Sequence, residues 1–193
     1  MGKWILGIAV LTICGWGQTA ETATMKVAAH ISDIEPEDFI NIRGAEGRAT
    51  ALLKQLGVQL DWAKRCSSCE SIEIQMHRDA PADLPKQAMA YALPFAKDPD
   101  KRIRIFTSRL PRVYGMPREI ILGYVIAHEI GHVLEQRDYH SDQGVMKACW
   151  NHADYRAMQY GRLFFTDEDQ EWIRQHFRTD RRWNAGGVTS SSR

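Results

Sequence analysis

The chain has 193 residues, which is enough for one domain with a sizeable core and too short for two ordinary ones. Apolar residues make up 44% of it and charged residues 25%, so the composition excludes bulk disorder and the fibrous classes. With 25 Lys and Arg against 24 Asp and Glu, the chain lacks the basic excess of a general nucleic-acid binder. We therefore expect no nucleic-acid partner.

Residues 1–23 have the layout of a secretory signal peptide. Lys3 gives a positive start, residues 4–16 are almost wholly apolar, and small and polar residues follow. The apolar run is shorter than the roughly 20 residues that a bilayer-spanning helix needs, which favours export over a membrane anchor. A lipid attachment at Cys14 is disfavoured because Ile13 is bulky. We expect a secreted or periplasmic protein with no stable membrane span after signal cleavage.

In the elements that follow, apolar residues recur either at every second position, as in a strand, or at helical spacing. Strands are predicted at residues 24–31, 58–62, 72–76, 88–93 and 102–107. Prolines near both ends of the 88–93 segment favour an edge position for that strand. A helix is predicted over residues 35–56, where Gly57 ends it.

Two helices are predicted in the second half of the chain, and the chain is expected to be irregular from His132 to Gly144. Pro117 opens one helix and Thr166 opens another, which has acids in its first turn. The Gly- and Ser-rich residues 179–193 are expected to form a disordered tail. This order predicts one α+β domain over residues 24–178, with a small mixed sheet packed on helices.

The segment that points to chemistry is His128-Glu129-Ile130-Gly131-His132. On a helix, the two histidines lie on one face and can share a zinc ion, while Glu129 can act as general base on a zinc-bound water. A catalytic zinc needs a third protein ligand and an open position. Asp138 and His140 are the two candidates that follow.

This stretch resembles the metzincin zinc peptidases, in which a third ligand follows the two helix histidines and a methionine lies in a turn below the metal. Met146 matches that methionine, whereas Glu135 stands at a glycine position of the family and Asp138 at its third histidine. The segment is most similar to short secreted bacterial members with a longer loop, which place the third ligand at His140. Imidazole is also the softer zinc partner, so His140 is preferred over Asp138.

The resemblance implies a secreted zinc-dependent endopeptidase that acts as a monomer on peptides or proteins through a zinc-activated water, with Glu129 as general base. By the same analogy, the edge strand would hold an extended substrate through Ala88, Ala90 and Ala92. The alternative is an exported zinc-binding protein of the same fold that has no activity. Glu129 argues against this alternative, because a structural zinc site needs no general base.

The remaining candidates are cysteines and tyrosines. In an exported protein, Cys66 and Cys69 are expected to form a local disulfide, rather than a second zinc site or a redox motif. Cys149 is expected to be buried as a small apolar residue. Tyr139 and Tyr155 are interpreted as packing residues, with a role at an oxyanion as the alternative.

Overall fold

The computed structural model of the protein describes residues 25–32, 40–62, 71–92 and 101–179. The predicted signal peptide, the Cys66–Cys69 pair and nearly all of the predicted tail lie outside these residues. Within the described part of the chain, no helix combines the length and apolar character that crossing a bilayer would need.

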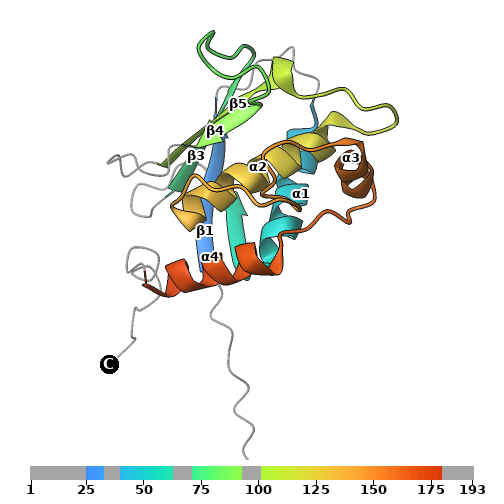
Figure 1. The fold of residues 1–193 in the computed structure, drawn as a ribbon. Coiled ribbons are helices and arrows are strands. Elements are labelled where there is room, and N and C mark those ends of the chain that lie inside the picture. The colour runs from blue at the N-terminus through green and yellow to red at the C-terminus, as the bar shows by residue number, and fades with distance from the viewer. Residues whose placement is uncertain (1–24, 33–39, 63–70, 93–100, 180–193) are drawn as a thin grey trace, which may run out of the picture.

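The structure is an α+β fold built on a five-stranded mixed sheet (Figure 1). Its strands, in chain order, are β1 (Met25–Ser32), β2 (Val58–Trp62), β3 (Ser71–His77), β4 (Ala90–Ala92) and β5 (Lys101–Phe106). The spatial order is β2-β1-β3-β5-β4, in which only β4 runs antiparallel to its neighbour. The five predicted strands are confirmed to within one or two residues at most ends, and the edge position of β4 is confirmed.

Four α-helices accompany the sheet in the described residues: α1 (Ile42–Lys54), α2 (Arg118–Glu135), α3 (His152–Gln159) and α4 (Asp167–Thr179). A short 3-10 helix, Thr107–Arg109, follows β5. The predicted helix starts at Pro117 and Thr166 are confirmed to within one residue. Of the helix predicted over residues 35–56, residues 35–39 lie outside the described part of the chain. Residues 40 and 41 are not helical, because the Asn41 side chain accepts the backbone N–H of Gly44 and caps a helix that begins at Ile42.

The helix α3 was not predicted. It is short and polar, and a capping box stabilises its start: Asn151 accepts the N–H groups of Ala153 and Asp154, and Asp154 accepts the N–H of Asn151. The Asn-x-x-Asp spacing was the available signal.

The helices α1 and α2 pack against each other beside the sheet, and α2 runs through the centre of the molecule (Figure 1). They approach closely at Gly123, where a Cβ atom would stand 2.6 Å from Arg48 Cβ and 2.8 Å from the carbonyl oxygen of Ala45. From Ile121 to its last residue, α2 is buried on all sides. The helix that carries the motif histidines is therefore a rigid central element.

Candidate metal centre

Three histidine side chains meet at the surface of α2. His128 and His132 are one turn apart on the helix and both are buried. The loop after the helix returns the exposed His140 to them. His132 Nε2 lies 3.0 Å from His128 Nε2 and 3.3 Å from His140 Nε2, and the three ligand atoms lie within 4.8 Å of one another. Among the described residues, these three form the cluster that could hold a metal ion.

The backbone fixes which ring nitrogens face the cluster centre. His128 Nδ1 lies 2.8 Å from the carbonyl oxygen of Val145, and His132 Nδ1 lies 3.2 Å from that of Arg137. A carbonyl only accepts, so each Nδ1 must carry the proton and donate it. Both Nε2 atoms then present lone pairs toward each other. Lone pairs held at 3.0 Å repel, and a shared cation relieves that repulsion.

The donor set fits zinc. Nitrogen ligands at about 2.0–2.1 Å from a tetrahedral zinc ion stand roughly 3.3 Å apart. Two of the three separations in the cluster, 3.0 and 3.3 Å, are close to this value, and all three ligand atoms lie within 4.8 Å of one another. The second-nitrogen hydrogen bonds to carbonyl groups are also the usual support of metal-binding histidines. The residues present therefore fit a metal bound by three imidazoles.

The histidines of the helix are neutral at ordinary pH. Burial, followed by the neighbouring imidazole of His132, lowers the pKa of His128 to about 3. Burial, followed by His140, lowers the pKa of His132 to about 4. Metal binding requires the neutral ring, so neither residue has to lose a proton first at pH 7.

Of the two candidates for the third ligand, the structure brings His140 into this cluster. Asp138 lines the adjoining cleft and is exposed. The helix ends at Glu135, and the next residue, Gln136, adopts a left-handed backbone conformation with φ of 52°. Position 135 is thus still helical and needs no glycine, which explains how Glu135 can stand there.

Met146 packs against Gly131 of α2 and belongs to a turn of residues 144–146, the methionine turn. It is fully buried, and a Cβ atom on Gly131 would stand 2.5 Å from its sulfur. Gly144 has φ of +80°, and a Cβ there would meet the carbonyl oxygen of Phe164 at 2.6 Å. Both glycines are therefore needed for the turn to pack this closely under α2.

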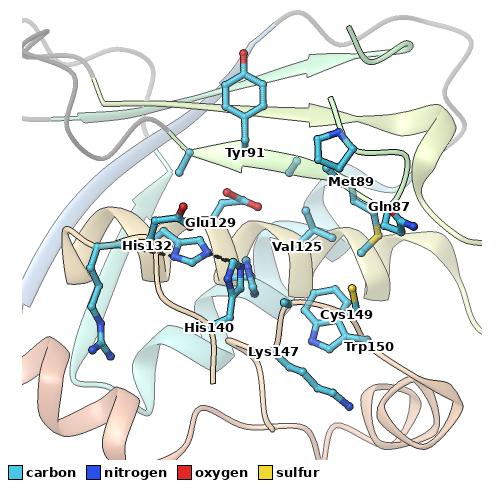
Figure 2. Close-up of a pocket in the computed structure, with 18 residues that line it drawn as sticks. Gln87, Met89, Tyr91, Val125, Glu129, His132, His140, Lys147, Cys149 and Trp150 are labelled. Atoms are coloured by element: carbon cyan, nitrogen blue, oxygen red, sulfur yellow. Dashed lines mark hydrogen bonds between the residues drawn. The ribbon is translucent and has the colours of Figure 1, made fainter. Parts of the chain in front are cut away.

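Glu129 lies between the histidines and β4, at the base of a cleft of about 750 Å³ (Figure 2). The backbone N–H of Ala92 donates a hydrogen bond to its carboxylate. The second oxygen, Oε2, is buried and has no hydrogen-bond partner. Burial raises the pKa of Glu129 to about 8, the Ala92 hydrogen bond opposes that shift, and the charge of Asp138 adds to it.

The edge strand β4 forms one wall of the cleft. In its antiparallel ladder, Phe106 N–H donates to the Met89 carbonyl at 2.8 Å, and Tyr91 pairs with Arg104. By alternation, the backbone groups of Ala90 and Ala92 point away from β5. Ala88 differs from them, because its N–H donates to Pro85 and its carbonyl accepts from Arg109.

Sequence reasoning missed the opposite wall and one end of the cleft. Lys147, Ala148, Cys149 and Trp150 line the wall. In Figure 2, Met89, Val125, Cys149 and Trp150 gather on one side of the histidines, so that end is largely apolar. Val125 could have been found, since it precedes His128 by almost one helical turn.

The prediction that Cys149 is buried was wrong. Its thiol is free and exposed, because the segment after the methionine turn borders the cleft instead of entering the core. Neither Tyr139 nor Tyr155 is among the cleft residues. The guanidinium of Arg137 lies over the ring of Tyr139, at 4.2 Å from its centroid.

No protein-family model matches the chain, and no curated protein sequence matches it.

Proposed function

We propose that this protein is a zinc-dependent endopeptidase with a metzincin-like site. The observation that carries the proposal is Glu129: a buried carboxylate with an unpartnered oxygen, next to three converging imidazoles, at the base of an open cleft. A structural site would have four protein ligands and no such carboxylate. The edge strand, the left-handed residue after the helix and the buried methionine against α2 also fit the metzincin resemblance.

The three histidines would hold the metal and leave its fourth position open to the cleft. When bound, zinc supplies Lewis-acid polarisation of a carbonyl group and lowers the pKa of a water molecule to about 7.

Glu129 serves as the proton carrier. Its free Oε2 accepts the proton of the attacking water, and it returns that proton to the leaving amine. Burial raises the pKa of this carboxyl to about 8 without a cation, so Glu129 holds a proton firmly. A positive charge within the histidine cluster lowers the pKa, because it favours the carboxylate. These opposing effects bring the proton affinity toward the operating pH, as a shared acid and base requires.

An extended peptide would lie along β4. The outward backbone groups of Ala90, together with the Ala92 carbonyl, can pair with such a peptide. The backbone N–H and carbonyl of Ala88 are already hydrogen-bonded within the chain. Main-chain pairing gives affinity for many sequences. The apolar end of the cleft, at Met89, Val125 and Trp150, would take an apolar side chain of the substrate.

The test is cleavage of casein and of a peptide library by the parent and by Glu129→Gln, with zinc content measured in both. The amide keeps the shape of the carboxylate but cannot take up the proton, so we expect activity to fall by about 10²–10⁴-fold with zinc retained. Equal activity in both proteins would contradict the role of Glu129. A zinc-loaded parent without activity on any peptide would favour the alternative, a zinc-binding protein that does not catalyse.

The ligand set has its own control. His140→Ala should lose zinc and Asp138→Ala should keep it, because only His140 reaches the helix histidines. The reverse result would identify Asp138 as the third ligand.

A further inference from the structure

His140 is the one cluster histidine that lies outside α2. The helix histidines sit on a buried element, and backbone carbonyls fix both rings. His140 is exposed and belongs to the loop between the helix and the methionine turn. The rigidity of this ligand must therefore come from its neighbours in the chain.

The next residue, Ser141, is anchored at two points. Its backbone N–H donates to the carbonyl of Met146 at 3.0 Å, and its hydroxyl donates a short hydrogen bond to Asp169 Oδ1. Ser141 is only 7% exposed, and Asp169 is fully buried. The residue that follows His140 is thus tied to the methionine turn by its backbone and to α4 by its side chain.

Asp169 makes a second set of bonds with its other oxygen. Oδ2 accepts the N–H of Thr166 at 2.9 Å, and Thr166 Oγ1 accepts the N–H of Asp169 at 3.1 Å, which completes the capping box of α4. A capping box works at the protein surface and does not require burial. Burying a carboxylate is costly unless its oxygens are satisfied, so the Ser141 bond accounts for the place of Asp169 in the interior.

A second contact from α4 reaches the start of the same loop. Trp172 Nε1 donates to the carbonyl of Glu135 at 3.3 Å, and the guanidinium of Arg137 lies 4.0 Å from the centroid of the Trp172 ring. Arg137 in turn offers its carbonyl to His132 Nδ1. The segment between the helix end and Ser141 (residues 136–141) is called the ligand loop. Both of its ends therefore contact α4.

We propose that Asp169 is a positioning residue for the metal site, which fixes His140 through the hydroxyl of Ser141. The inference rests on the proposed metal site and adds to it a residue, 29 positions after His140, that touches neither metal nor substrate. Asp169 limits the positions that the His140 ring can take before the metal arrives. Loss of the link leaves the ligand in place but widens its range of positions, so the metal binds more weakly.

The test measures zinc affinity of the full chain by competition with a chromophoric chelator. Ser141→Ala and Asp169→Ala should each weaken zinc binding by about 10–100-fold, the usual effect of removing a group that supports a ligand. The double variant should bind about as weakly as the weaker single one, because both changes break the same contact. The cobalt-substituted protein should show an altered visible spectrum in each variant, since that spectrum reports ligand geometry.

Thr166→Ala is the matched control. It removes the other half of the capping box but leaves the Ser141–Asp169 bond, so it should lower the melting temperature with zinc affinity within about twofold of the parent. If Asp169→Ala does not fold, Ser141→Ala decides alone.

Unchanged affinity in Ser141→Ala overturns the proposal and leaves the metal site standing. Weakening in Asp169→Ala but not in Ser141→Ala overturns it too, because the effect would belong to the helix cap. A parent that binds no zinc overturns both this proposal and the metal site.

Discussion

Gly131 decides how closely the methionine turn approaches the two helix histidines. It occupies the second variable position of the motif, where the zinc chemistry itself asks for no particular residue. Its reason lies in packing, because a Cβ there would stand 2.5 Å from Met146 Sδ and 3.3 Å from the ring of Phe165. The carbonyl of Val145, which holds His128, belongs to the same turn. A side chain at Gly131 would therefore push away a group that orients a ligand.

We predict that Gly131→Ala destabilises the protein by about 1–3 kcal/mol, the usual cost of overfilling a packed core. Gly47→Ala is the control in α1, since nothing lies within 4 Å of the added methyl group. Alanine is the better helix former, so this change should stabilise by about 0.5–1 kcal/mol. Chemical denaturation of both variants measures the difference. If both substitutions change the free energy of unfolding equally, Met146 can move aside for the added methyl group without cost, and the prediction is wrong.

At the scale of elements, β4 is short, and its backbone serves two neighbours. One set of groups pairs with β5, and the other faces the cleft, where the Ala92 N–H reaches Glu129. Proline removes an N–H and is tolerated at a strand edge when that N–H is outside the ladder. Ala92 and Ala90 both meet this condition, but only Ala92 contacts the carboxylate.

We predict that Ala92→Pro keeps the fold and lowers kcat for peptide cleavage by roughly tenfold or more, because Glu129 loses the bond that orients it. The same bond lowers the pKa of Glu129, so its loss should move the acidic limb of the pH profile upward. Ala90→Pro should raise KM and leave that limb in place, since it removes only a group that faces the substrate. Steady-state kinetics across pH separate the two variants, and matching profiles would contradict the assigned role of Ala92.

The elements that could be predicted are those whose sequence pattern matches their burial. The strand at Val58–Trp62 alternates in sequence and in burial, and α2 carries its histidines at helical spacing. The helix α3 was not predicted because its start depends on the Asn151 cap rather than on an apolar stripe. The place of Cys149 and Trp150 in the cleft was not predicted for another reason. They line the cleft because tertiary packing places their loop opposite β4. No local pattern encodes that placement.

At the scale of the whole molecule, the metal site would join two parts of the chain. The sheet, α1 and α2 come first in sequence, and the ligand loop, the methionine turn, α3 and α4 follow the motif helix. His140 belongs to the second part, and its cluster partners belong to α2. A metal bound by all three would cross-link the loop to the central helix, so its removal should weaken the folded state as a whole.

We predict that a strong chelator lowers the melting temperature by on the order of 10 °C and that added zinc restores it. A ligand that binds only the folded state at about 1,000 times its Kd stabilises by about 4 kcal/mol, and 1 kcal/mol shifts the melting temperature of a chain this size by about 2–4 °C. Thermal unfolding with and without chelator, followed by circular dichroism, measures the shift. His140→Ala removes the loop's ligand while the buried helix pair remains, so its melting temperature should respond little to chelator. If the parent melts at the same temperature with and without chelator, the cluster binds no metal in the folded protein. If the melting temperature of His140→Ala responds to chelator as strongly as that of the parent, the stabilising metal is bound elsewhere in the chain.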